Sequence, residues 1–102
     1  MDRVAMLSEI LQQNPEDAFA RYGLAMEYSK LGEVERAMQE FERLLQVHPD
    51  YTAGYFMAAQ TLAAAGRTDQ AKSMLTQGIA SAMRTGNSHA QSEMEGMLAD
   101  LG

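Results

Sequence analysis

The chain contains no cysteine, only two prolines among its 102 residues, and few of the β-branched apolar residues that favour strands. Without cysteine it can form neither a disulfide framework nor a thiolate metal site, and two histidines are too few for a zinc site. The valines and isoleucines are too isolated to alternate with polar residues along a half-buried strand. They are Val4, Ile10, Val34, Val47 and Ile79. These absences favour an all-helical fold that binds no metal.

Positive charge is also scarce, because eight Lys and Arg residues stand against fourteen Asp and Glu, for a net charge of -6. That sign is wrong for a protein that binds a phosphate backbone, and no basic cluster offsets it locally. No apolar run approaches the ~18 residues of a membrane span, and the first six residues lack the basic start and apolar core of a secretion signal. We therefore expect one cytoplasmic domain over residues 1–102 that binds neither nucleic acid nor membrane.

Helix-forming residues, mainly Ala, Leu, Met, Glu and Gln, fill the segments between the turns. The turns are marked by Pro15 and Pro49, which follow helical runs, and by Gly32, Gly66 and Gly86, which stand where a left-handed residue ends a helix. Ser88 followed by Gln91 predicts a capping box at the start of the last helix. We predict six helices near residues 2–13, 17–31, 34–47, 51–65, 68–84 and 88–101.

An internal repeat with an offset of 34 residues runs along the chain. Small and turn residues recur at this offset in the pairs Pro15/Pro49, Ala25/Ala59, Gly32/Gly66 and Ala37/Ala71. Apolar residues recur in the series Leu7/Phe41/Leu75 and Leu11/Leu45/Ile79, and Tyr22 pairs with Phe56. A fixed period of this length is typical of stacked helical units, each of which hides its apolar face on a neighbour.

The spacing resembles that of the tetratricopeptide repeat, whose 34-residue helix-turn-helix unit has the pattern W-x2-L-G-x2-Y, then A-x3-F, then P. Residues 18–51 match this pattern well but have Arg21 at the first aromatic position, and residues 52–85 match less well, with Met83 in place of the closing proline. Residues 2–15 resemble the second helix of a unit whose first helix is absent. Residues 88–101 follow a different apolar phase, so we interpret them as a capping helix.

The resemblance implies a short right-handed α-solenoid of antiparallel helical hairpins, and a scaffold that holds a peptide or partner helix in a concave groove. The first helix of each repeat would line that groove. In residues 17–31, Leu24, Tyr28 and Leu31 share one face, which we expect to pack against the next helix and its Phe41. Gly78, inside a predicted helix, indicates a close approach of another helix.

A second apolar face on residues 17–31 and 51–65 provides the candidate partner-binding residues. They are Phe19, Tyr22, Met26, Lys30, Phe56, Met57 and Gln60. Flexible methionines beside aromatic rings suit an apolar or amphipathic segment. A clamp for a terminal carboxylate is not supported, because Lys30 is the one cation among these positions. The alternative interpretation is that this face is only the contact between neighbouring first helices.

No sequence pattern indicates catalysis or a cofactor. We interpret His48 and His89 as surface residues, and the nine methionines, which lie at helical spacings among Leu and Ala, as core residues. The leading hypothesis is a protein-interaction adaptor that is not an enzyme. The alternative is a self-associating module, in which the apolar residues Val4, Met6, Leu7, Ile10 and Leu11 of the N-terminal helix form a weak homodimer.

Overall fold

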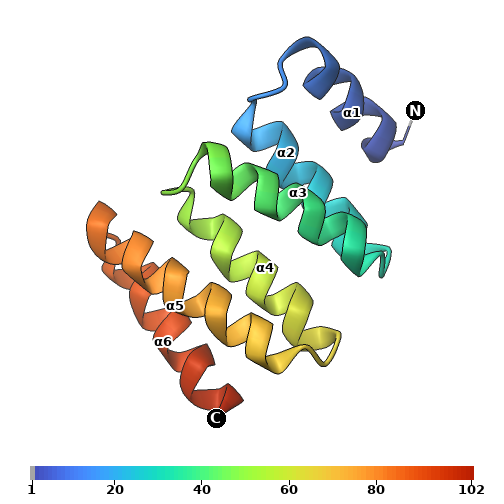
Figure 1. Cartoon of the computed structure of the whole chain (residues 1–102). Coiled ribbons are helices and arrows are strands. Elements are labelled where there is room, and N and C mark those ends of the chain that lie inside the picture. Colours follow the sequence, from blue (N-terminus) through green and yellow to red (C-terminus); the bar gives the residue numbers. More distant parts are fainter. Residues whose placement is uncertain (1) are drawn as a thin grey trace.

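The computed structural model describes residues 2–102, and within them it contains six α-helices and no strand. The helices are α1 (Arg3–Gln13), α2 (Ala18–Lys30), α3 (Val34–Val47), α4 (Thr52–Ala64), α5 (Thr68–Thr85) and α6 (Ser88–Leu101). Each predicted boundary lies within one residue of the observed one, so the predicted all-helical fold is confirmed. Met1, with which the predicted domain begins, lies outside the described residues. In Figure 1 each helix lies beside the one before it, and the N- and C-termini are at opposite ends of the stack.

Glycines end three of the helical segments as the sequence predicts. Gly32, Gly66 and Gly86 have φ values of 76°, 78° and 69°, a left-handed conformation in which other residues are strained. The backbone N–H after each glycine donates to a carbonyl of the last helical turn, for example from Glu33 to Tyr28 at 3.0 Å and from Arg67 to Leu62 at 2.9 Å. These bonds satisfy carbonyls that the helix leaves free, so each helix stops sharply and the chain reverses.

The predicted capping box at the start of α6 is wrong. The N-cap is Asn87, whose side-chain oxygen accepts a hydrogen bond from the Ala90 N–H at 3.0 Å. Ser88 is already the first helical residue, so its hydroxyl is one position too late for the capping role. The Gln91 amide instead donates to Glu95 Oε2 one turn further along, at 3.3 Å.

Small residues lie where paired helices approach most closely, as the repeat predicts. Ala25, Ala37, Ala59 and Ala71 have no exposed surface, and Phe41 is buried in one cluster with three of them. Leu24 is buried as well, but against Leu7 and Leu11 of α1 and not against α3 and Phe41 as expected. Two further expectations for the core are wrong. Leu31 is 62% exposed because α2 ends at Lys30 and leaves it in the turn, and Tyr28 is only half-buried, with the Arg36 guanidinium 5.7 Å from its ring centroid.

The methionines are less buried than predicted. Among the described residues, only Met38 and Met94 belong to the buried core, whereas Met6 and Met83 are exposed. The others are half-buried on helix faces that a neighbouring helix covers only in part. Helical spacing therefore placed the methionines on apolar faces without showing how far each face is covered.

Arg21 performs the hydrogen bonding of the aromatic residue that it replaces in the repeat pattern. Its Nη2 donates to the carbonyl of Pro15 at 2.9 Å, while Tyr55, at the equivalent position of the next unit, donates its hydroxyl to the carbonyl of Pro49 at 2.7 Å. Arg21 Nη1 also contacts Glu40 Oε1 on α3 at 2.6 Å. The departure from the pattern therefore preserves the contact between each hairpin and the preceding turn.

The predicted close approach at Gly78 is confirmed. A Cβ atom on Gly78 would lie 2.5 Å from Met94 Sδ of α6 and 2.7 Å from Tyr55 Cβ of α4. At the preceding contact between hairpins, where α3 meets α4, the large residue and the glycine exchange places. Leu44, at the position of Gly78 in the repeat, is buried, and Gly54 of α4 makes room for it. Each junction thus combines a large residue with a glycine, on opposite helices in the two cases.

Gly78→Ala is expected to destabilise the protein by about 1–3 kcal/mol, although alanine is the better helix former, because the new methyl group overpacks the contact with Tyr55. Gly96→Ala in α6 is the matched control, since nothing lies within 4 Å of a Cβ at that position. It should stabilise the protein by about 0.5–1 kcal/mol. Urea unfolding followed by circular dichroism measures both values, and a stabilising Gly78→Ala would contradict the close approach.

Candidate functional site

The seven candidate residues lie on α2 and α4, two helices that contact each other across the hairpins. We call them together the α2–α4 face. Phe19, Lys30 and Gln60 are exposed, with Phe19 at 75%, and Tyr22, Met26, Phe56 and Met57 are half-buried. The face therefore has both an accessible part and a part that packs against the core.

The half-buried part of the face is also a contact between helices. Tyr22 packs its ring against Tyr51, with centroids 5.3 Å apart and planes at 47°. Tyr22, Met26 and Met57 all touch the buried cluster around Phe41 and Leu62. These three residues therefore also pack inside the protein, on a cluster to which both α2 and α4 contribute.

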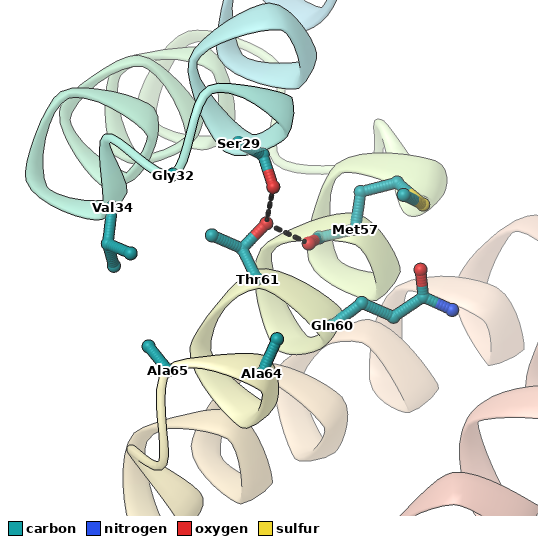
Figure 2. A pocket seen from close by; sticks show the side chains of 8 residues that line it. All are labelled: Ser29, Gly32, Val34, Met57, Gln60, Thr61, Ala64 and Ala65. Carbon is teal, nitrogen blue, oxygen red and sulfur yellow. Dashed lines mark hydrogen bonds between the residues drawn. The ribbon is translucent and has the colours of Figure 1, made fainter.

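A hollow of about 400 Å³ lies between the C-terminal end of α2, the start of α3, and α4 (Figure 2). Its lining consists of Ser29, Gly32, Val34, Met57, Gln60, Thr61, Ala64 and Ala65. The Ser29 and Thr61 hydroxyl oxygens are 2.8 Å apart, and Thr61 Oγ1 also donates to the Met57 carbonyl at 2.8 Å. These two hydroxyls are thus satisfied within the protein, and the apolar atoms of Met57 and the alanines remain available to a ligand.

A second hollow, of about 210 Å³, lies between α4 and α6 and contains a part of the site that the sequence analysis missed. Its lining residues are Thr52, Ala53, Phe56, Asn87, His89, Ala90, Glu93 and Met94. Of these, only Phe56 was predicted. His89 Nε2 lies 3.2 Å from Glu93 Oε1, so α6 adds a histidine–glutamate pair beside an apolar wall. The residues of α6 were missed because that helix does not follow the 34-residue offset.

The charges beside the α2–α4 face are already engaged. Glu27 accepts a hydrogen bond from Arg3 Nε at 2.7 Å, and Lys30 Nζ lies 3.8 Å from the same carboxylate oxygen. At the far end of α4, Arg84 binds Asp50 through both Nε, at 3.0 Å, and Nη2, at 2.7 Å. Between these pairs α4 carries no charged residue from Tyr51 to Gly66.

Burial raises the pKa of three tyrosines in this region. For Tyr22 burial is the larger cause and the neighbouring Tyr51 the smaller one, and for Tyr51 burial is followed by the nearby Asp17. The pKa of Tyr55 is also raised by burial, while Arg84 lowers it and Asp50 raises it. All three phenols therefore remain neutral hydrogen-bonding groups at neutral pH.

The remaining candidate chemistry is sparse within residues 2–102. No group of three or more His, Asp or Glu side chains there is arranged to hold a metal ion, and no helix of that segment is both long and apolar enough to cross a membrane. His89 is exposed as expected. His48 is not a plain surface residue, because it is half-buried and its Nε2 lies 2.9 Å from the Glu16 carbonyl oxygen. It joins the turn after α3 to the turn after α1.

Comparisons with known proteins agree with the geometry. A family model for the tetratricopeptide repeat matches residues 4–50 and 30–92. A TPR repeat-containing protein of Pseudomonas aeruginosa is 32% identical over 95 residues, which cover 93% of this chain and 90% of that protein.

Two solved structures are similar in fold. PcrH, crystallised in complex with the chaperone binding region of PopD, has a TM-score of 0.88 at 20% identity, with 96% of this chain and 74% of that chain covered. The TPR2B domain of yeast Sti1, in complex with pHsp70, has a TM-score of 0.88 at 18% identity, with 96% and 78% covered.

Stability is expected to fall as the pH rises through the tyrosine range. The pKa values of Tyr22, Tyr51 and Tyr55 are raised above the ordinary value of 10.0, so the unfolded chain loses these protons at lower pH than the folded chain does. The stability that this difference contributes is full below about pH 10 and is lost as the pH rises through the folded-state pKa values.

Tyr51→Phe should make this loss of stability shallower, because it removes one of the three phenols and the effect of Tyr51 on the pKa of Tyr22. Urea unfolding at a series of pH values from neutral into the tyrosine range measures the slope. The same slope in the variant and the wild type would mean that Tyr51 does not titrate differently in the two states.

Proposed function

The chain belongs to the tetratricopeptide repeat family, and from that premise we propose that it is a protein-interaction module that holds a segment of a partner protein against the α2–α4 face. Two proteins of the same fold were solved in complexes, PcrH with the chaperone binding region of PopD and the TPR2B domain of yeast Sti1 with pHsp70. Those complexes support segment capture as the general mode of action. The residues that perform it in this chain are part of the proposal.

The chemistry of the face favours an apolar or amphipathic segment. The face combines an exposed aromatic ring, Phe19, with the half-buried rings and thioethers of its other residues, and α4 contributes no charge. Met57 lines the hollow between α2 and α4, and Phe56 lines the hollow between α4 and α6. Each hollow suits one apolar side chain of an extended or helical segment, which would bury surface that is now in contact with water.

A terminal carboxylate is a poor ligand for this face. Lys30 is its one cation, and Lys30 already shares the carboxylate of Glu27 with Arg3. The net charge of -6 would also slow the approach of an acidic segment. We propose that Lys30 influences the association rate and its salt dependence, while the aromatic residues supply affinity.

A peptide selected from a random displayed library against the wild-type protein tests this proposal. Phe56→Ala and Tyr22→Ala are expected to weaken binding of the selected peptide by ~2 kcal/mol, about thirtyfold, as truncation of aromatic hot spots does. Met83→Ala is the matched control, because Met83 is 63% exposed but lies on α5, outside the face. It should leave the affinity unchanged.

Thermal unfolding of the same variants separates lost binding from lost structure. Leu24→Ala, at a buried position, should cost ~2–5 kcal/mol, and the two groove variants should cost less because their side chains are only half-buried. If Tyr22→Ala and Phe56→Ala melt as early as Leu24→Ala, these rings are core residues and the proposed face is wrong. Equal affinity of the selected peptide for wild type and Phe56→Ala would also contradict it.

A further inference from the structure

The outer side of α1 carries a stripe of residues that is exposed although the same stripe is covered in α3. The residues of the stripe of α1 are all exposed: Arg3, Met6, Ile10 and Gln13. The residues 34 positions later, on α3, are all buried or half-buried: Ala37, Glu40, Leu44 and Val47. At an apolar position of the stripe, Ile10 is 42% exposed while Leu44 is 0% exposed. The two helices therefore differ in what covers them more than in the spacing of their apolar residues.

In α3 this stripe is covered by α2. Arg21 of α2 pairs with Glu40 at 2.6 Å, and Ala25 of α2 lies in one buried cluster with Ala37 and Phe41. Within residues 2–102, no helix covers the apolar residues of the stripe, Met6 and Ile10, in this way. Helix α2 reaches the stripe at Arg3, which pairs with Glu27, and otherwise packs on another side of α1 through Leu7 and Leu11. The stripe of α1 is thus a helix-docking surface without a docked helix in the described part of the chain.

We propose that the stripe of α1 binds an amphipathic helix of a partner protein, which packs on α1 as α2 packs on α3 and α4 on α5. The packing of α2 on α3 and of α4 on α5 shows which kind of helix face fits such a stripe. Each of α2 and α4 presents an alanine with no exposed surface, Ala25 or Ala59, and larger apolar residues one turn away. The partner helix therefore has a small residue at the centre of its apolar stripe.

The charge of Glu9 indicates which side chains the first turn of the partner helix carries. Glu9 stands at the repeat position of Arg43, and Arg43 lines a depression with Glu16, Asp17 and Ala18 at the start of α2. By the same geometry, Glu9 faces the first turn of a helix docked on α1. Glu9 takes part in no ion pair among the described residues. A lysine or arginine in the first turn of the partner helix would complement it.

The same charges argue against a second copy of this chain as the occupant. Two α1 helices facing each other would bring two Glu9 carboxylates to one interface, and Arg3, the cation of the stripe, is already paired with Glu27 of α2. The helix at the other end of the stack, α6, carries the exposed acids Glu93, Glu95 and Asp100, so it also repels Glu9. A basic amphipathic helix has neither conflict.

The test uses the full chain and a synthetic helix built on α4, which carries no charge. The probe is a fluorescent peptide with the sequence of residues 51–66, held helical by a hydrocarbon staple between positions 56 and 60 and carrying Thr52→Lys in its first turn, at the repeat position of Ala18. A second peptide carries Thr52→Glu instead. Fluorescence anisotropy measures binding of both peptides to each protein variant.

We expect the lysine peptide to bind the wild type, and Ile10→Gln to weaken that binding at least about tenfold, as loss of a central apolar anchor does. Met83→Gln, which alters an equally accessible apolar residue on α5, should leave it unchanged. The glutamate peptide should bind the wild type more weakly than the lysine peptide. Glu9→Lys should reverse that order, a result that a general loss of structure cannot produce.

Several outcomes would overturn the proposal. The lysine peptide could fail to bind the wild type at millimolar concentration, or bind Ile10→Gln as tightly as the wild type. The Glu9→Lys variant could prefer the lysine peptide as the wild type does. Light scattering could also show that the protein alone is a dimer which Ile10→Gln converts to a monomer, and the occupant of the stripe would then be a second copy. If binding of the probe is lost in Phe56→Ala and kept in Ile10→Gln, the peptide lies on the α2–α4 face, which supports the proposed function and overturns this proposal.

Discussion

Four alanines with no exposed surface, Ala25, Ala37, Ala59 and Ala71, determine how closely the paired helices approach. Their small side chains allow the large residues beside them, such as Phe41 and Leu75, to fill the space between helices completely. Because these contacts recur every 34 residues, each hairpin adds to the previous one with the same geometry. The turns, the position of the α2–α4 face and the open stripe of α1 all depend on that stacking.

The structure keeps the contacts of the repeat while changing the residues that make them. A guanidinium in one unit and a phenol in the next bind the carbonyl of the preceding proline, at 2.9 Å for Arg21 and 2.7 Å for Tyr55. Leucine faces glycine at one junction, and glycine faces methionine at the next. A repeat of this kind conserves hydrogen-bond partners and total volume at a contact, so identity between units can be low while the stacking stays regular.

The candidate binding residues also stabilise the fold, which limits how the surface can change. Tyr22 touches Tyr51 and the core, while Phe56 packs beside α6 and lines a hollow. Half-buried rings are held in place by the core, so they lose little further freedom when a partner binds. The largely exposed Phe19 has less such support and is free to adapt. The face thus combines fixed and adaptable aromatic contacts.

The sequence by itself determined the six helices of residues 2–102 to within one residue, the glycine turns, the buried alanines and the family, because these depend on local conformational preference and on a fixed period. Only the tertiary structure decided which faces are covered. Ile10 is exposed because no helix lies against it in the described chain, and Leu31 is exposed because α2 ends one residue before it, although the apolar spacing of both is helical. The 18 residues of α5, against 14 in α3, move α6 out of the repeat register. That shift brings His89 and Glu93 to the edge of the site, a placement that depends on packing between distant helices and that no local pattern encodes.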